Sequence, residues 1–88
     1  MGTTTATVTI RYFAAARAAA GRETEPLELP DGGTVDDVLT ALKERHSPEL
    51  ARVLDRCSFL LDEVAVRDRA AVVPAGATLD VLPPFAGG

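Results

Sequence analysis

The residues with the clearest chemical potential form the run Pro83-Pro84-Phe85-Ala86-Gly87-Gly88. The two prolines have fixed φ angles and favour an extended backbone, whereas the two glycines have no side chain to pack. A tail of this kind is thin enough to thread a narrow channel in another protein, and the one reactive group it delivers is the terminal carboxylate. We therefore expect Gly88 to be the reactive residue and Gly87 to give it access.

The chemistry open to such a carboxylate begins with activation. A terminal carboxyl group has an ordinary pKa of about 3.3–3.7, so at neutral pH it is ionised and a poor electrophile. Attack on the α-phosphate of ATP would give an acyl-adenylate, from which a sulfur nucleophile displaces AMP and leaves a thiocarboxylate. The chain has no P-loop motif, and the turn glycines Gly32 and Gly33 are weak evidence for phosphate binding. We expect no cofactor on this chain, and ATP with Mg²⁺ on an activating partner.

The composition is that of one small domain with an acidic balance. The chain has 88 residues and a formal net charge of −4. Its hydrophobic fraction of 47% is sufficient for a packed core. Nucleic-acid binders need a basic patch, and an acidic chain instead suits a partner with a basic docking surface. No apolar run approaches the ~20 residues of a membrane span. We expect a cytoplasmic protein that binds neither nucleic acid nor membranes.

Hydrophobic patterns divide the rest of the chain into strands and helices. We expect strands over 6–12, 24–29, 59–61, 64–66 and 78–82, helices over 13–20 and 34–45, and a short helix from Pro48. In the last strand, Leu79 and Val81 face inward and Asp80 outward. The helix over 34–45 has an N-cap at Thr34 and one apolar stripe, formed by Val35, Val38, Leu39 and Leu42. This order predicts an α+β fold with the main helix on one face of a sheet.

Three segments resemble the molybdopterin synthase small subunit and its thiamin-pathway relatives, the β-grasp sulfur carriers. They are Arg11-Tyr12-Phe13-Ala14 with Arg17 and Gly21, Gly33-Thr34-Val35 with Leu39, and the ending Val81-Leu82-Pro83-Pro84-Phe85-Ala86-Gly87-Gly88. The resemblance spans nearly the whole chain, and the double proline favours the molybdopterin branch. It implies a ubiquitin-like β-grasp with a mixed sheet, in which the first strand lies beside and parallel to the last. The domain would cover 1–82 and the flexible tail 83–88.

The resemblance also implies an activity that needs two partners. An adenylyltransferase resembling the ubiquitin-activating enzymes would adenylate Gly88, and a persulfide would convert it to a thiocarboxylate. The tail would then enter the large subunit of molybdopterin synthase, which puts the sulfur into a pterin precursor. The chain departs from the family at Asp62-Glu63, where Asn-Gly is frequent, and at Gly76-Ala77, where Gly-Asp is frequent.

Other residues that could do chemistry have simpler interpretations. The single cysteine, Cys57, is expected to be a packing residue, and no disulfide is possible. His46 is expected at a helix end, and without a second histidine it does not predict a metal site. The acidic residues Glu23, Glu25 and Glu28 are expected to form a solvated strand face.

Other functions share parts of this pattern. Carriers for thiamin, cysteine or tRNA thiolation use the same end chemistry, and a ubiquitin-like modifier shares the diglycine and the adenylate. A plain interaction module of the same fold is a further class. A stand-alone enzyme is disfavoured, because no nucleophile and base form a pair in the sequence. We expect the chain to be a non-catalytic carrier, or the small subunit of a sulfurtransferase.

The alternation of the last strand generates a first testable prediction. If Leu79 and Val81 face inward, Leu82 faces away from the core and forms an apolar patch with Phe85 beside the tail. Phe85→Ala should weaken partner binding by one to several kcal/mol, roughly the scale of an interface hot spot, and leave the domain folded. Titration with the partner measures this, and an unchanged affinity would contradict it.

Overall fold

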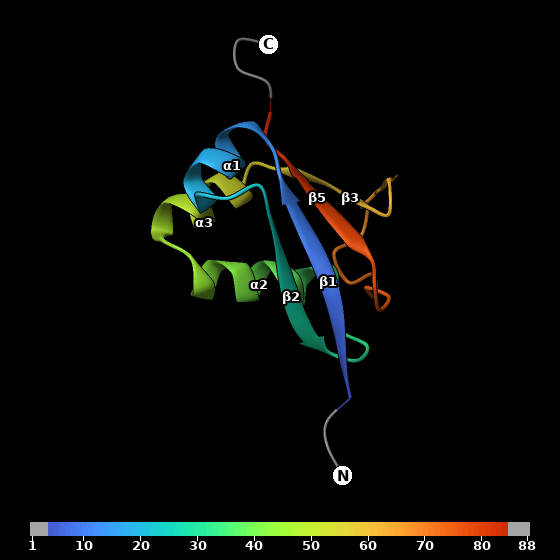
Figure 1. Ribbon diagram of the computed structural model, residues 1–88. Coiled ribbons are helices and arrows are strands. Elements are labelled where there is room, and N and C mark those ends of the chain that lie inside the picture. Colours follow the sequence, from blue (N-terminus) through green and yellow to red (C-terminus); the bar gives the residue numbers. More distant parts are fainter. Residues whose placement is uncertain (1–3, 85–88) are drawn as a thin grey trace.

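In the computed structural model, which describes residues 4–84, a five-stranded mixed sheet has its helices on one face (Figure 1). The strand order is β2-β1-β5-β3-β4. The strands are β1 Thr5–Tyr12, β2 Thr24–Pro30, β3 Ser58–Leu61, β4 Val64–Ala65 and β5 Thr78–Leu82. The helices are α1 Ala14–Ala20, α2 Val35–Arg45 and α3 Pro48–Leu54.

The first and last strands lie side by side in the middle of the sheet. β1 pairs in parallel with β5, with Ile10 opposite Leu79 and Tyr12 opposite Val81. β2 and β3 flank this pair in antiparallel orientation, and the short β4 continues from β3 at the edge. The predicted parallel neighbourhood of the first and last strands is therefore confirmed.

The main helix forms for the local reasons that the sequence indicated. The Thr34 Oγ1 atom accepts a hydrogen bond from the Asp37 N–H at 3.2 Å, and Asp37 Oδ2 accepts one from the Thr34 N–H at 2.9 Å. This reciprocal capping box satisfies two N–H groups that the first turn leaves without partners. The whole predicted stripe, Val35, Val38, Leu39 and Leu42, is buried, so the predicted packing of α2 against the sheet is confirmed.

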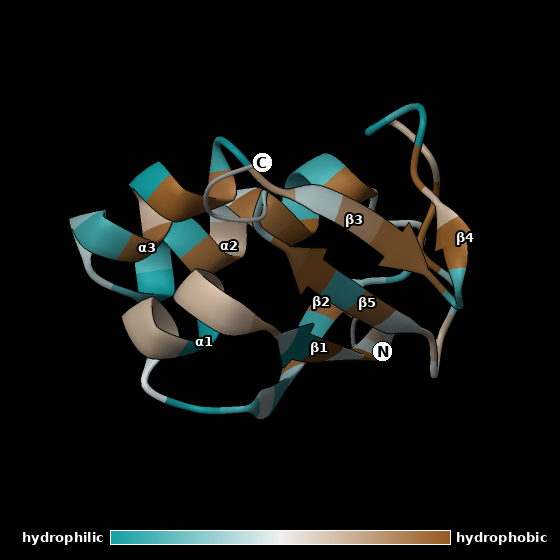
Figure 2. Ribbon diagram, turned by 90° about the horizontal axis from the view of Figure 1, so that it is seen from above, coloured by the Kyte–Doolittle hydropathy of each residue, from teal (hydrophilic) through white to brown (hydrophobic). Residues whose placement is uncertain are grey.

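The core lies between the sheet and the three helices, as the view from above shows (Figure 2). Its fully buried aliphatic side chains include Ile10 from β1, Leu79 and Val81 from β5, and Leu50 from α3. α1 is short because Gly21, in the left-handed region at φ 76°, ends it by bonding back to the Arg17 carbonyl.

One predicted boundary is wrong, and Asp80 faces outward as predicted but is buried. The predicted helix start at Phe13 is one residue too early: Phe13 is the N-cap of α1, with an extended backbone. Its N–H donates to the Val81 carbonyl at 3.3 Å, just beyond the end of β1. Asp80 lies on the outer face but is only 5% exposed. The guanidinium of its cross-strand neighbour Arg11 covers it, with N–O distances of 2.6 and 2.9 Å.

The turn between β3 and β4 is a two-residue hairpin loop with both residues in the left-handed region. Asp62 has φ 47° and Glu63 has φ 70°, the geometry for which Asn-Gly is preferred. Asp62 is fitted to this position because its side chain accepts a hydrogen bond from the Thr78 N–H at 2.9 Å. Glu63 forms no such bond with a described residue, and its Cβ makes the left-handed conformation costly.

We therefore expect Glu63→Gly to raise the free energy of unfolding by about 0.5–1 kcal/mol. Glycine removes the cost of the left-handed conformation, and part of this gain is lost because glycine gives the unfolded chain more conformational freedom. Urea denaturation measures the change. Glu63→Ala keeps the Cβ and is the matched control, which should show no such gain. Equal stabilisation by both variants would mean that the charge of Glu63, and not its backbone conformation, is the unfavourable feature.

Candidate functional site

The sheet delivers the chain to its tail from the central strand β5. Leu82, the last residue of β5, pairs with Ser58 of β3, and beyond it Pro83 is half-buried and Pro84 exposed. Neither proline has an N–H that could extend the sheet, so the chain leaves the sheet at this point. The predicted reactive residue Gly88, its neighbour Gly87 and the predicted contact residue Phe85 lie outside the described residues.

An apolar hollow of about 520 Å³ opens where the tail leaves, and we call it the tail-exit groove. It is lined by Phe13, Ala14, Ala15, Arg56, Ser58, Leu82, Pro83 and Pro84. Leu82 is half-buried on the opposite face from Leu79 and Val81, which is the orientation that the alternation predicted. The groove thus brings together the end of β1, the start of α1 and the first residues of the tail.

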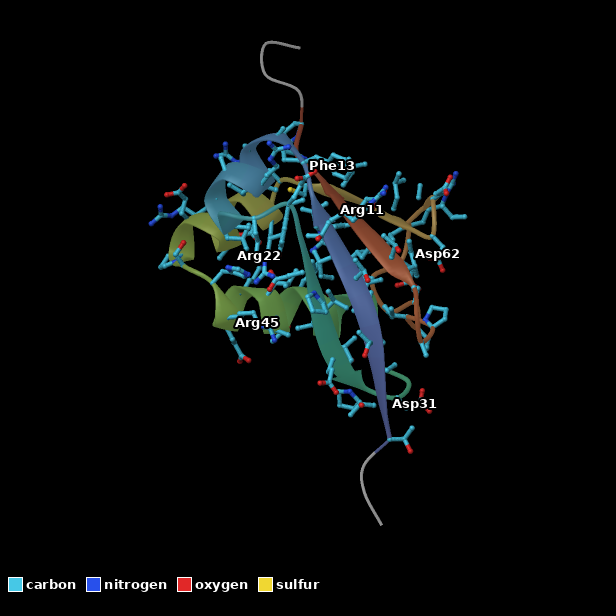
Figure 3. All side chains as sticks on the ribbon, viewed as in Figure 1. Arg11, Phe13, Arg22, Asp31, Arg45 and Asp62 are labelled. Carbon is cyan, nitrogen blue, oxygen red and sulfur yellow. The ribbon has the colours of Figure 1, made fainter. Side chains whose placement is uncertain are left out.

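Phe13 is the aromatic contributor to this groove, and sequence reasoning missed it. The residue is 38% exposed and lies beside the tail exit (Figure 3). The Arg11 guanidinium sits 5.6 Å from the ring centroid, within reach of a cation–π contact. A signal for this position was present in the sequence. Thr9, Arg11 and Phe13 alternate along the outer face of β1, and Phe13 lies one residue beyond the strand that we predicted.

A buried carboxylate overturns the interpretation of the acidic residues of β2. Glu25 is 1% exposed, because it shares the inner face of β2 with Leu27 and Leu29, whereas Glu23 and Glu28 are exposed. Glu25 accepts hydrogen bonds from the Tyr12 hydroxyl and from Arg45 at 3.0 Å, and its Oε1 lies 2.5 Å from His46 Nε2. Arg22 adds an ion pair at 3.7 Å.

The environment of Glu25 favours its ionised form. Burial alone would raise the pKa of this carboxyl, but the hydrogen bonds from Tyr12, His46 and Arg45 outweigh burial and hold its pKa below the ordinary value. Burial and the Glu25 hydrogen bond together raise the pKa of Tyr12 well above its usual range, so Tyr12 remains a donor. Arg22 and Arg45 extend over this region from either side (Figure 3). The cluster ties β1, β2 and the end of α2 together.

Cys57 has the properties of a packing residue. Its side chain is buried, and the thiol donates to the Val53 carbonyl with an S–O distance of 3.1 Å. Burial raises the pKa of Cys57 to about 11, so little of the reactive thiolate forms at neutral pH.

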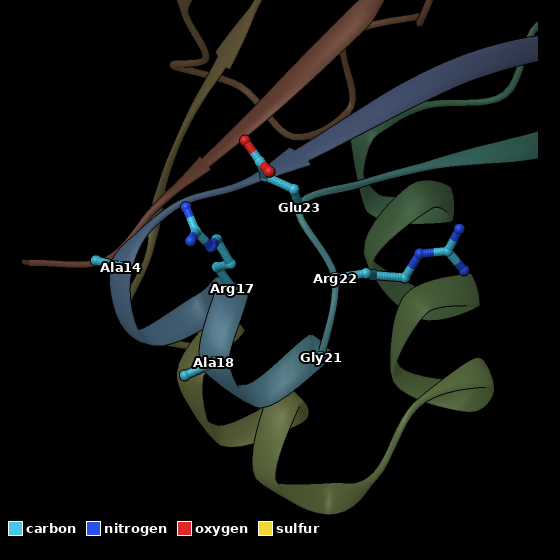
Figure 4. A pocket seen from close by; sticks show the side chains of 6 residues that line it. All are labelled: Ala14, Arg17, Ala18, Gly21, Arg22 and Glu23. Carbon is cyan, nitrogen blue, oxygen red and sulfur yellow. The ribbon is translucent and has the colours of Figure 1, made fainter.

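A second hollow, of about 480 Å³, lies on the other side of α1 (Figure 4). It is lined by Ala14, Arg17, Ala18, Gly21, Arg22 and Glu23, but Arg22 extends away from it toward α2 and is engaged by Glu25. Within residues 4–84, no group of three or more His, Cys, Asp or Glu could hold a metal ion. None of the described helices is long and apolar enough to cross a membrane.

Comparison with known proteins now places the chain in a family. The model of the ThiS family matches residues 10–88, from β1 through the diglycine. This chain belongs to the ThiS family. Comparison with curated proteins yields no match. The membership puts the chain among the β-grasp sulfur carriers, so the predicted resemblance is confirmed.

Solved structures confirm the predicted ubiquitin-like β-grasp fold. Small archaeal modifier protein 1 from Haloferax volcanii matches with a TM-score of 0.80 and 28% identity, over 91% of this chain and 99% of that one. A protein named as molybdopterin converting factor subunit 1, from Pyrococcus furiosus, matches with a TM-score of 0.81 and 26% identity, over 91% and 99%. A chain in a complex of subunits 1 and 2 of the Helicobacter pylori molybdopterin-converting factor matches with a TM-score of 0.70 and 20% identity. The match covers 93% of this chain and 99% of that one.

The buried carboxylate generates a prediction about stability and pH. Glu25→Gln should lower the free energy of unfolding by about 3 kcal/mol at neutral pH, because it removes the charge that the arginines and His46 surround. The pKa of Glu25 is depressed in the folded state. The ordinary pKa of Glu is about 4.3. The contribution of Glu25 to the free energy of unfolding is therefore complete above that pH and is lost as the pH falls through the folded-state pKa.

Urea denaturation of both proteins over a range of pH measures this difference. The gap between the wild type and Glu25→Gln should be constant down to about pH 4.3 and should narrow in more acidic solution. Glu23→Gln is the matched control, since Glu23 is exposed. A loss of stability equal to that of the control would show that the cluster does not stabilise the fold.

Proposed function

We propose that this protein carries sulfur on the carboxyl group of Gly88. The observation that supports this proposal best is the path of the chain: the central strand β5 ends at Leu82 and Pro83-Pro84 leads out of the sheet. The ThiS family match continues to residue 88 and so includes Gly87 and Gly88. A rigid domain that presents a side-chain-free end is suited to delivering one carboxylate into the active sites of other proteins.

The proposed reaction proceeds in two stages on partner enzymes. A carboxylate oxygen of Gly88 attacks the α-phosphorus of ATP, bound with Mg²⁺ by a ubiquitin-activating-like adenylyltransferase, and pyrophosphate leaves. The terminal sulfur of a persulfide then attacks the acyl carbon, and AMP leaves with the electron pair of the cleaved C–O bond. A second thiol attacks the inner sulfur of the resulting acyl disulfide, so that a disulfide forms and the thiocarboxylate is released. The glycines contribute by leaving the acyl carbon unhindered.

The pathway that we propose is molybdenum cofactor biosynthesis, with this chain as the small subunit of molybdopterin synthase. The similarity to the Pyrococcus furiosus protein and the Pro83-Pro84 ending support this choice. The large subunit would be the sulfur acceptor, and the Helicobacter pylori complex is an example of two such subunits held together. Sulfur delivery for thiamin, cysteine or tRNA thiolation is the alternative that uses the same end chemistry.

A second candidate function is covalent protein modification. The similarity to small archaeal modifier protein 1, at 28% identity, favours this possibility. Both functions begin with the adenylate of Gly88 and differ in the nucleophile that follows. A sulfur nucleophile gives a thiocarboxylate, whereas the amino group of a lysine gives an isopeptide bond, so the product distinguishes them.

The direct test is incubation of the full chain with the adenylyltransferase, ATP, Mg²⁺ and a persulfide donor. We expect intact-mass spectrometry to show the exchange of one oxygen for sulfur, and fragmentation to locate the sulfur on Gly88. Deletion of Gly88, or extension of the chain beyond it, should abolish the exchange. Neither change touches the described core, so the thermal midpoint should stay within about a degree, as surface changes contribute little to stability.

The carrier mechanism would be contradicted by sulfur on Cys57 with none on the terminus. Cys57→Ser is the matched control for that outcome and should be modified at Gly88 as the wild type is. A ladder of isopeptide-linked products, formed when a lysate of the source organism is added, would move the assignment to the modifier class.

A further inference from the structure

The charge around the tail-exit groove is opposite in sign to that of the whole chain. Arg56 lines the groove itself, and together with Arg52 it lines an adjoining hollow of about 340 Å³. Pro83 and Pro84 line both hollows. No carboxylate of a described residue lines either one, although the chain has a net charge of −4. The tail therefore leaves the domain beside a local positive charge.

Arg52 and Arg56 are not used by the fold within residues 4–84. Arg11 is bound to Asp80, and Arg22 and Arg45 are bound to Glu25. Neither Arg52 nor Arg56 forms an ion pair with a described residue, and both are exposed.

The carboxylates nearest to these arginines in the sequence are Glu49 and Asp55, and neither forms an ion pair with them. Asp55, which precedes Arg56, pairs with Lys43 of α2 at 2.8 Å. Two guanidinium groups thus remain with free donors at the rim of an apolar hollow. A guanidinium presents several N–H donors in a planar fork that matches a carboxylate.

Several of the acidic side chains that produce the net charge lie on other parts of the molecule. Asp36 and Asp37 lie in the first turn of α2, and Asp31 lies at the opposite end of the molecule from Phe13 (Figure 3). Net charge alone led us to expect a basic surface on the partner. The distribution of charge around the tail favours the opposite, because a docking surface responds to the charges that it faces.

We propose that the tail-exit groove docks a segment of the adenylyltransferase that combines an apolar side chain with carboxylates. The apolar side chain enters between Phe13 and Leu82, and the carboxylates pair with Arg52 and Arg56. This proposal rests on the proposed carrier function, since it assigns the surface that holds the domain while the tail enters the active site. The arginines act on docking and take no part in the chemistry at Gly88.

The test compares charge reversals in the full-length chain. Arg52→Glu and Arg56→Glu should each raise the carrier concentration for half-maximal Gly88 thiocarboxylation by ~10-fold, as for a charge pair at an interface. The rate at saturation should be unchanged. Arg67→Glu is the matched control, since Arg67 is exposed and lines neither hollow, and it should behave as the wild type. Arg52→Lys and Arg56→Lys should recover most of the loss.

A direct titration of each variant with the adenylyltransferase separates docking from chemistry. Weaker binding of Arg52→Glu and Arg56→Glu, with Arg67→Glu unchanged, supports the docking surface even if Gly88 is not modified. Normal modification and binding of both variants would overturn the docking proposal and leave the carrier function intact. An equal loss in all three variants would overturn it in favour of general electrostatic attraction. Self-association of the wild-type chain that both reversals abolish would overturn it in favour of a second copy of this chain.

Circular dichroism checks that the charge-reversal variants are folded. Arg52 and Arg56 are exposed and have no described partners within the domain, so their reversal should leave the thermal midpoint near that of the wild type. A variant that is unfolded would be replaced by the corresponding alanine variant, for which the same order of affinities is expected.

Discussion

The parallel pairing of β1 with β5 is the constraint on which the rest of the structure depends. Two parallel neighbours cannot be joined by a tight turn, so the chain between Phe13 and Ala77 must cross over and return. That crossover supplies both the flanking strands and the three helices. The paired strands are buried on their inner face, where Ile10, Leu79 and Val81 are fully inaccessible. The last strand is therefore among the best-anchored segments, although it leads directly to the tail.

The Glu25 cluster completes this arrangement at the β2 edge. A buried carboxylate is costly unless charged partners surround it, and here Tyr12, Arg45 and His46 do so from β1 and the end of α2. Two arginines also cover the unpaired edge of β2: Arg22 donates to the carbonyl of Thr24, and Arg45 donates to the carbonyl of Pro26. Pro26 and Pro30 have no N–H to offer. This edge is thereby protected against pairing with a strand of another chain.

The proposed function requires a stable body and an end that two different enzymes can accept. The strand ladder holds Leu82 through Ser58, and the prolines then prevent the ladder from continuing into the tail. The groove formed by Phe13, Leu82 and the start of α1 lies at this transition. In the proposed function, a partner that binds this groove gains binding energy from groups that take no part in the reaction at Gly88.

The sequence by itself determined the local elements and the fold class. Alternation in β1 and β5, the capping box at Thr34 and the apolar stripe of α2 each involve residues a few positions apart, so their pattern can be recognised along the chain. The diglycine and the double proline are likewise features of composition, and they carried the family assignment. The two short strands around Asp62-Glu63 were also predicted, but not the left-handed conformation of both turn residues, which their side chains disfavour.

Only the tertiary structure decided which charges are buried and which remain free. Glu25 is separated by 13 residues from Tyr12 and by 21 from His46, and Arg11 by 69 from Asp80. The strand pattern assigned Glu25 to solvent and Asp80 to the outer face of the sheet. Nothing in either neighbourhood shows that an arginine from another element covers the carboxylate. The groove, with Arg52 and Arg56 beside the prolines, is equally a product of three distant segments. The energy of a charge depends on the groups that surround it in space, and the fold alone brings those groups together.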